Sequence, residues 1–534
     1  MASDRLSTAD VFKALSAGKI TRRDAVMLLA MAGMGGSALT GLSSPVRAAA
    51  TPKSGGHMRF AMAHGEVADT LDPGHVNNGY TTVIAYAMTN TLTEVATDGS
   101  LVPKLAESWE ASEGASKWVF RIRKGVEFHN GKTLTAKDVV ASINHHRRPD
   151  STSSAKPIVS SIVSIEPDGG NAVVIKLESG DADIPFKFST FSFGIYPANE
   201  DGSLNWQGMI GAGAYKLTKF VPGERAEFIK NPNYWLTDRG FFDSGELLSV
   251  KDVTARQNAL LAGEVDGIDR LDLSTLGEFG KSPGIKVDEV SGKLHYTFPM
   301  LTNTAPFSDN NVRLALKHAI DREAMLEAIL FGHGVLGNDQ PITSAYPFFA
   351  ADIEQRTYDL DKARFYLKQA GMETLDVKLS AANAAFTRAT DAALIYQQSA
   401  EKAGIKINVE REPDDGYWTN IWQKKPWCAA YWFGTPTPDD ILTQAYSGGA
   451  SWNDTAWNNE RFNTVLKQAR SELDQTKRAE MYRELQLLVR DEGGAVIPLF
   501  ANDVFATSDK VAHGKLANNY EVDGRMFFDR WWFA

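Results

Sequence analysis

The sequence predicts an α/β protein, because strand-like runs alternate with amphipathic helices from about residue 57 to the carboxyl end. Its composition agrees with a globular fold, since 43% of the residues are hydrophobic and 23% are charged. The 44 glycines and 21 prolines are near average usage, which excludes collagen and extensive disorder. A chain of 534 residues is too long for one hydrophobic core. We therefore expect about three or four domains, or two large lobes built from split segments.

The first fifty residues differ from the rest and have the pattern of an export signal. Arg22 and Arg23 precede a charge-free stretch over residues 25–42, and small residues at 48–50 form an A-x-A cleavage site. Adjacent arginines before a weakly hydrophobic stretch resemble a twin-arginine (Tat) signal, with Ala25 where that signal prefers Phe. The alternative is a membrane anchor, which the glycines of the stretch disfavour. We expect residues 1–50 to be an export signal and the remainder to be periplasmic.

Charge and cysteine usage narrow the functional classes. The net charge is −10, with 66 Asp and Glu against 56 Lys and Arg, which disfavours a nucleic-acid partner because such binding depends on phosphate neutralisation. Cys428 is the only cysteine in the sequence, so no intrachain disulfide can form. It lies in an apolar run over residues 426–432, which is typical of a buried thiol rather than a nucleophile.

The first half of the chain contains three predicted strands and one predicted helix. Residues 118–123 alternate with period two, residues 172–177 follow a turn-forming Asp-Gly-Gly-Asn, and residues 215–217 follow Gly-Ala-Gly. Residues 135–143 have helical periodicity, and Thr135 is the expected cap. This mixture of strands and helices is what an α/β unit requires.

The second half is richer in predicted helices. One has Asp309 or Asn310 as its cap and an apolar stripe over residues 312–330 that Gly332 ends. The others are a helix from Asp359 or Asp361 to Gly371, a helix over 387–403 followed by a strand over 405–409, and a helix pair over 462–469 and 481–489 before Gly493. The helix followed by a strand predicts half of a βαβ unit.

The usual signatures of catalysis are missing from the sequence. It has no G-x-S-x-G, no G-x-x-x-x-G-K-[ST], no H-E-x-x-H and no C-x-x-C. His145 and His146 are adjacent in a predicted helix and point in different directions, whereas helical metal ligands need a spacing of three or four. We therefore expect no catalytic residue, no metal site and no cofactor.

Several segments, taken in order, resemble one known family. They are Leu71-Asp72-Pro73, residues 98–109, residues 120–139, residues 211–217, residues 231–235, residues 259–266, residues 312–323 and residues 363–371. Together they resemble the family 5 extracytoplasmic solute-binding proteins, the dipeptide, oligopeptide and nickel-type binding components of ABC importers. The resemblance covers residues 57–534. Turn and cap residues account for most of these motifs, so they specify the fold rather than a ligand.

The resemblance implies a two-lobe periplasmic-binding-protein fold of type II, with a hinge between the lobes. Residues 57–90, 211–298 and 502–534 are then expected to form lobe I, residues 91–210 an extra subdomain of lobe I, and residues 299–501 lobe II. It also implies capture of a peptide or peptide-like solute by lobe closure and delivery to permease subunits in the inner membrane. We expect a monomer that binds no nucleic acid.

Other functions remain open at this stage. The solute is a short peptide by family default, and an opine, an amino-acid–sugar conjugate or an oligosaccharide is the alternative. Uptake of a metal chelate or of haem is a lesser option, because the single cysteine and the scattered histidines offer no evident ligand cluster. A periplasmic chaperone or an exported hydrolase on the same scaffold is a different class, because a fold does not fix a function. Turnover without a partner would indicate a hydrolase, and promiscuous binding of unfolded chains would indicate a chaperone.

The resemblance places a ligand-binding loop in lobe II. Its expected contact residues are Trp432, Phe433, Gly434, Thr435 and Asp439. In dipeptide-binding members an acidic residue that pairs with the peptide's amino terminus follows the Trp-x-Gly motif, and here Thr435 stands at that position. Asp439 and Asp440 are alternative acids, and a helix-capping role is their competing interpretation.

Further contact candidates lie elsewhere in the chain. Trp452 and Asn453 offer a flat ring and an amide to a polar ligand, although a packed loop is an equal alternative. The remaining candidates are Asn77, Asn78, Tyr80, Asn303 and Arg388. We expect Trp432→Ala to abolish ligand binding and to leave the fold intact.

Overall fold

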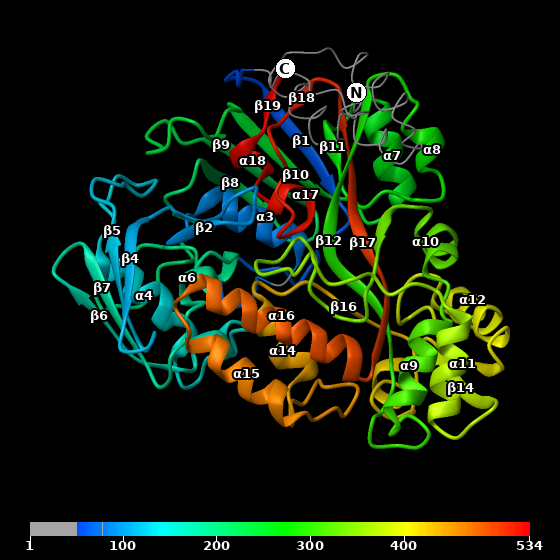
Figure 1. Ribbon diagram of the computed structural model, residues 1–534. Coiled ribbons are helices and arrows are strands. Elements are labelled where there is room, and N and C mark those ends of the chain that lie inside the picture. The colour runs from blue at the N-terminus through cyan, green and yellow to red at the C-terminus, as the bar shows by residue number, and fades with distance from the viewer. Residues whose placement is uncertain (1–50, 77) are drawn as a thin grey trace, which may run out of the picture. The chain divides into compact units, whose positions relative to one another are not determined.

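The computed structural model of the protein describes residues 51–76 and 78–534. The predicted export signal at 1–50 and the candidate Asn77 lie outside these residues. Residues 52–534 form one unit, and its elements are labelled in Figure 1. In the part of the chain that the structure describes, no helix combines the length and the apolar character that a membrane span requires.

A nine-stranded mixed sheet is the largest element of the fold. The strand order is β16-β12-β17-β11-β1-β10-β9-β8, and β13 also pairs with β17. β1 is parallel to both β10 and β11, and the other neighbours are antiparallel. The strands are β1 (His57–Met62), β8 (Tyr215–Val221), β9 (Arg225–Lys230), β10 (Ser244–Ser249), β11 (Gly267–Ile268), β12 (Ile285–Pro299), β13 (Gly334–Leu336), β16 (Ala430–Trp432) and β17 (Ala495–Ser508). The predicted strand at 215–217 is confirmed as the start of β8.

The two longest strands of this sheet are neighbours. β12 and β17 run side by side over almost their whole length (Figure 1). Their register is interrupted between Ser291 and His295. Gly292 lies in this interruption, and a Cβ atom there would be only 2.6 Å from the Ala501 carbonyl oxygen. A glycine is therefore required where the two backbones approach each other.

A separate four-stranded sheet has the order β4-β5-β7-β6 and packs against α4. Its elements are β4 (Ala106–Ser112), β5 (Lys117–Ile122), β6 (Ile162–Asp168), β7 (Ala172–Leu177) and α4 (Ala136–Arg147). The predicted strands at 118–123 and 172–177 are confirmed as β5 and β7. Thr135 is the cap of α4, and the Asp138 carboxylate accepts the Thr135 backbone N–H at 2.8 Å, which completes a capping box.

The predicted helix over 312–330 is two helices in the structure. α9 (Asn310–Ala319) has Asp309 as its cap, and α10 (Arg322–Leu330) begins after Asp321. Ile320 has an extended backbone, and the Asp321 carboxylate accepts the Ala324 N–H at 3.0 Å. The apolar stripe continues across the break, but Asp321 provides a second cap, and this local hydrogen bond ends the first helix.

The other helical predictions for the second half are confirmed. α11 (Leu360–Gln369) has Asp359 as its cap, and α12 (Ala389–Glu401) connects the parallel strands β14 (Leu375–Ala381) and β15 (Ile405–Arg411). The helix pair is α15 (Glu460–Ser471) and α16 (Gln475–Glu492), preceded by α14 (Pro438–Tyr446). The βαβ unit and the helix pair belong to two separate hydrophobic clusters.

The remaining elements are short. They are α3 (Gly79–Met88), β2 (Thr93–Val95), β3 (Leu101–Pro103), α5 (Lys156–Val159), α6 (Ile184–Lys187), the 3₁₀ helix η3 (Phe191–Phe193), α7 (Val253–Leu261), α8 (Leu276–Phe279), α13 (Tyr417–Asn420), β18 (Val511–Ala512), α17 (Glu521–Gly524), α18 (Phe527–Arg530) and β19 (Trp532–Phe533). Cys428 is buried as predicted, and burial raises the pKa of its thiol.

His146 makes the stability of the fold dependent on pH. It is buried, its ring nitrogens lie 2.7 Å from Ser153 Oγ and 2.8 Å from the Ser192 carbonyl oxygen, and burial lowers its pKa to about 4. The unfolded chain binds a proton near pH 6.5, so acidification from pH 7 to pH 5 favours unfolding by about 2 kcal/mol through this residue. In urea titrations His146→Gln should lose less stability than the parent between these pH values. His57→Gln, at an exposed residue, should lose as much as the parent, and equal losses in all three proteins would contradict the assignment.

Candidate functional site

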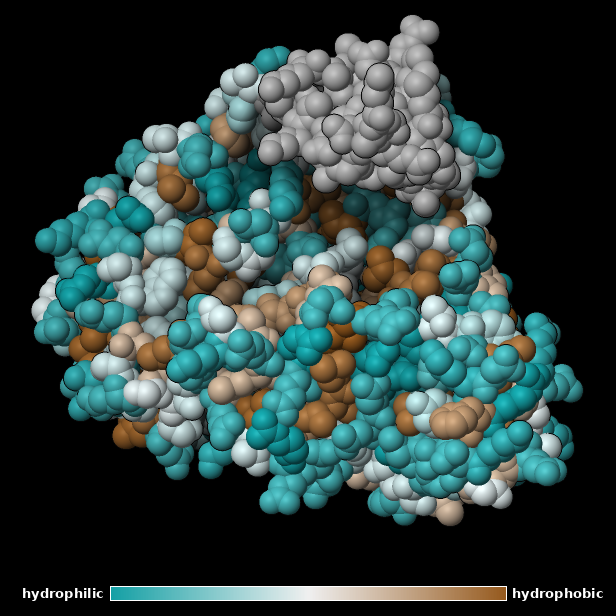
Figure 2. Space-filling model, in the orientation of Figure 1, coloured by the Kyte–Doolittle hydropathy of each residue, from teal (hydrophilic) through white to brown (hydrophobic). Residues whose placement is uncertain are grey.

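Figure 2 shows one face hollowed over the region where Figure 1 places α3, α17 and the middle of β12 and β17. Contacts bring several elements together here. The rings of Phe191 and Tyr520 lie 5.9 Å apart, and the Arg525 guanidinium lies 5.4 Å from the Tyr520 ring centre. Burial raises the pKa of Tyr520 to about 12, with opposing contributions from Arg525 and Asp440. Tyr520 therefore lies within electrostatic range of the start of α14.

The predicted ligand-binding loop follows β16 and leads into α14. Trp432 ends β16 and pairs with His295 of β12. A Cβ atom on Gly434 would lie 2.5 Å from the Cβ of Lys293, so this position has no room for a larger residue. Phe433, between them, is 53% exposed. The close approach at Gly434 holds the loop against β12 and leaves the Phe433 ring in solvent.

Thr435 is buried and is held in place by three hydrogen bonds. Its N–H donates to the Tyr346 hydroxyl at 2.9 Å, its own hydroxyl donates to the Thr437 carbonyl at 2.9 Å, and its carbonyl accepts from Lys293 Nζ at 3.0 Å. The Lys293 ammonium also lies 4.1 Å from the centre of the Tyr346 ring. Burial lowers the pKa of Lys293 to about 7, and Asp440 opposes this shift. The position where dipeptide binders carry an acid is therefore surrounded by neutral groups and a lysine.

The acids at the start of α14 have partners within the protein. The Asp439 carboxylate accepts from Arg470 Nε, at 3.1 Å for each of its two oxygens. Asp440 completes a capping box with Thr437. Burial raises the pKa of Asp440. Asp440 therefore has the helix-capping role that was its competing interpretation, whereas Asp439 forms a buried ion pair with Arg470.

A row of aromatic side chains lies beside the loop. The indole N–H groups of Trp422 and Trp432 both donate to Asp454 Oδ2, at 3.0 and 3.2 Å. Trp432 is only 4% exposed, whereas Trp452, whose ring centre is 6.1 Å away, is 48% exposed. We therefore expect Trp432→Ala to destabilise the fold, contrary to the expectation from sequence. Trp452 and Phe433 present the exposed rings.

The other candidates have different surroundings. The Asn453 side chain donates to the Ser447 and Trp457 carbonyls and accepts from Thr455, so it holds its own loop together. Asn78 caps α3 and donates to Asp69 at 2.6 Å, and Tyr80, in the first turn of α3, is fully buried. Asn303 is exposed and accepts from the Thr304 hydroxyl. Arg388 precedes α12 and pairs with Asp391 at 3.1 Å.

Sequence reasoning missed a group of charged residues in the hollow. Arg270 follows β11, and Glu521 and Arg525 belong to the segment around α17. Arg270 is 47% exposed, and both arginines donate to Glu521. The position of Arg270 in the sequence could have identified it as a site residue. Ligands of α/β sheets bind beyond the carboxyl ends of parallel strands, and Arg270 lies two residues after β11.

A buried ion pair connects two distant segments near this region. Arg478 of α16 donates to the Asp183 carboxylate at 2.9 Å, and the Ala182 N–H donates to the Arg470 carbonyl at 2.7 Å. Burial raises the pKa of Asp183 to about 6, although Arg478 lowers it. The contacts join the predicted extra subdomain to the predicted lobe II.

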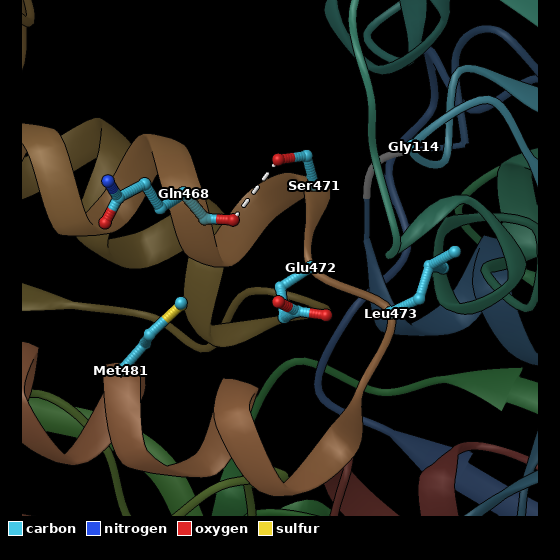
Figure 3. Close-up of a pocket in the computed structure, with 6 residues that line it drawn as sticks. All are labelled: Gly114, Gln468, Ser471, Glu472, Leu473 and Met481. Atoms are coloured by element: carbon cyan, nitrogen blue, oxygen red, sulfur yellow. Dashed lines mark hydrogen bonds between the residues drawn. The ribbon is translucent and has the colours of Figure 1, made fainter.

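A second depression lies outside this group of residues. Figure 3 shows it lined by Gly114, Gln468, Ser471, Glu472, Leu473 and Met481, with the Ser471 hydroxyl donating to the Gln468 carbonyl at 3.3 Å. None of the candidate contact residues lines it. Among the described residues, no group of three or more His, Cys, Asp or Glu side chains is arranged to hold a metal ion.

Exposed aromatic rings beside the loop after β16, together with paired arginines in the hollow, are typical of a site for a small solute. The chain belongs to the bacterial extracellular solute-binding proteins, family 5, whose family model matches residues 100–454. This confirms the family expected from the sequence motifs. The observed mixed α/β architecture agrees with the two-lobe fold of that family.

Known proteins resemble this chain over most of its length. Heme-binding protein A of Haemophilus influenzae is 26% identical, over 73% of this chain and 77% of its own. Di/tripeptide-binding protein 1 of Pseudomonas aeruginosa is also 26% identical, over 79% of this chain and 85% of its own. The structure of the PBP AgaA from A. tumefaciens R10 in complex with agropinic acid superposes with a TM-score of 0.69 at 22% identity, over 90% of this chain and 99% of AgaA.

Proposed function

We propose that this protein is the periplasmic substrate-binding component of an ABC importer and captures a peptide or peptide-like solute. The observation that carries the proposal is the hollow with its arginines. Arg270 follows β11 and Arg525 follows α17. The exposed rings of Trp452 and Phe433 belong to the region of the loop after β16. Rings supply stacking surface, and guanidinium groups supply directed hydrogen bonds. Membership of family 5 supports the same function.

Lobe closure is the mechanism that we propose. Residues 57–90, 211–298 and 502–534 form lobe I with the subdomain 91–210, and residues 299–501 form lobe II. β17 passes from lobe II to lobe I between Ala501 and Asn502, and the interrupted register with β12 at Ser291–His295 lies beside this point and provides a place for bending. A ligand that contacts both lobes favours the closed form, and a shift from 1:99 to 99:1 needs about 5.5 kcal/mol of differential binding.

The proposed cellular role follows from the leader and the family. Residues 1–50 direct export, through the Tat pathway, and the mature chain acts in the periplasm as a monomer. The closed form then docks on the permease subunits, and the protein performs no catalysis and binds no nucleic acid. The acidic balance of the chain supports the last point.

A second candidate ligand class is favoured by one observation. The loop that carries the acid of dipeptide binders has Thr435 at that position, and Asp439 and Asp440 are engaged within the protein. This arrangement gives the amino terminus of an ordinary peptide no obvious partner in the loop. An opine or an amino-acid–sugar conjugate is the alternative solute, and AgaA, a structural relative, was solved with agropinic acid.

The proposal is tested by a thermal-shift screen of the purified protein against di- and tripeptides, opines, oligosaccharides and metal chelates. A true ligand at 100 times its dissociation constant stabilises the folded state by about 2.7 kcal/mol. A shift with peptides supports the peptide function, and a shift only with opines or oligosaccharides supports the alternative. No shift with any compound, together with binding of unfolded chains, would replace both by a chaperone function.

A further inference from the structure

The carboxyl ends of three parallel strands meet at one edge of the large sheet. β1 lies between β10 and β11 and is parallel to both. His64 follows β1, and Asp269 and Arg270 follow β11 directly. The Ala63 N–H donates to the Asp269 carboxylate at 2.8 Å, which ties the two strand ends together. In α/β sheets this edge is where ligands bind.

Two arginines share one carboxylate at this edge. Arg270 donates to Glu521 Oε1 through Nε at 2.9 Å and through Nη2 at 2.6 Å. Arg525 donates to Glu521 Oε2 through Nη2 at 3.1 Å, and its Nη1 lies 3.4 Å from the Thr82 hydroxyl. The buried Nε of Arg525 has no hydrogen-bond partner among the described residues. The two guanidinium groups thus have more N–H donors than there are hydrogen-bond acceptors around them.

The local charge is positive. Burial opposes ionisation of Glu521, but Arg525 and Arg270 outweigh it and lower its pKa, so Glu521 is ionised. Burial and the nearby Glu521 raise the pKa of Asp503, which lies beside them. Burial and Arg270 lower the pKa of His64 to about 4, so this imidazole is neutral at pH 7. Asp269 forms an ion pair with Arg256, whose Nε lies 3.5 Å from Asp269 Oδ1. Arg270 and Arg525 therefore share the single ionised carboxylate of Glu521.

The backbone that presents the arginines is held in an unfavourable conformation. Arg270 has φ = 46° and Arg525 has φ = 61°, and Val522 and Asp523 also have positive φ. A left-handed backbone conformation is unfavourable for residues other than glycine. Surrounding contacts must fix these residues, and fixed donors lose little entropy when a ligand binds.

We propose that Arg270 and Arg525 bind a carboxylate of the transported solute in the hollow beside Tyr520. The solute class is therefore a carboxylate-bearing peptide-like compound, such as a peptide bound through its carboxyl terminus or an acidic opine. This inference rests on the proposed function and names the chemistry of its ligand. The exposed Arg270 receives the carboxylate first, and Arg525, whose guanidinium stacks on Tyr520, is the second donor.

The test compares matched probes by isothermal titration calorimetry. The probes are trialanine and trialanine amide, and agropinic acid and its primary amide. The parent protein should bind the acid of at least one pair about ten- to a hundredfold more tightly than its amide, because charge-assisted hydrogen bonds are lost with the charge. Equal affinities within each pair would overturn the carboxylate site and leave the proposed function standing. No binding of any probe would overturn both.

Three variants locate the effect. Arg270→Gln and Arg525→Gln should each remove most of the preference for the acid over the amide. Glu521→Gln removes the competing internal carboxylate and should tighten binding of the acid several-fold. Arg483→Gln, at an exposed pair with Asp352, is the matched control and should leave the preference unchanged.

Folding of each variant is checked by thermal melting. If Arg525→Gln does not fold, Arg270→Gln and Glu521→Gln decide the result, because Arg270 and Glu521 are partly exposed. An unchanged preference in Arg270→Gln, or weaker acid binding in Glu521→Gln, would overturn the inference.

Discussion

Asp339→Asn is expected to destabilise the protein by about 3–5 kcal/mol, the largest effect on stability that we predict for a nearly isosteric change. Asp339 is fully buried and accepts from Arg322 Nη2 at 2.7 and 2.8 Å, and it forms an ion pair with Arg356, whose Nε lies 2.9 Å from Asp339 Oδ2. Burial opposes ionisation of Asp339, but the two arginines lower its pKa. An amide at this position leaves a buried guanidinium without its counter-charge, and urea unfolding measures the loss.

The matched control is an exposed ion pair. Asp352 pairs with Arg483 at 2.8 Å, and both side chains are largely in solvent. Asp352→Asn should therefore change the free energy of unfolding by less than about 1 kcal/mol. Similar losses in Asp339→Asn and Asp352→Asn would show that the buried network contributes nothing beyond an ordinary surface pair.

Trp452→Ala is expected to weaken ligand binding about tenfold or more while the melting temperature stays close to that of the parent. The Trp452 ring is half exposed beside the loop after β16, so its removal takes stacking surface from a ligand without opening a cavity in the core. Trp432→Ala should instead lower the melting temperature strongly, because it removes a buried ring and one of the two donors to Asp454. Calorimetry with the ligand from the screen, combined with thermal melting, measures both effects.

Phe365→Ala serves as the control for an exposed aromatic side chain. Phe365 lies on α11 and is also exposed, outside the candidate site. It should leave both the affinity and the melting temperature unchanged. Unchanged affinity in a folded Trp452→Ala variant would exclude this ring from the site.

The local elements of the fold could be predicted because the signals are local. Thr135, Asp309 and Asp359 cap helices through hydrogen bonds to residues two or three positions away, and such patterns are visible in the sequence. The break at Ile320–Asp321 was missed since the apolar stripe continues through it. The register of β12 with β17 depends on residues about two hundred positions apart, which no local pattern records.

The candidate site was harder to predict, because its chemistry depends on tertiary contacts. The local sequence around a tryptophan does not show whether its ring is buried, as in Trp432, or exposed, as in Trp452. Arg270 and Glu521 stand 251 positions apart and become neighbours only through the sheet. The family resemblance placed the loop at 432–435 but carried no information on these charged residues.

A crystal structure of the protein with the strongest ligand from the screen tests the central claim most directly. We predict that the ligand lies in the hollow beside Tyr520, with a carboxylate oxygen within hydrogen-bond distance of Arg270 or Arg525 and an apolar part near Trp452 or Phe433. A ligand seated in the depression lined by Gln468, Leu473 and Met481, or one without contact to either arginine, would contradict this account.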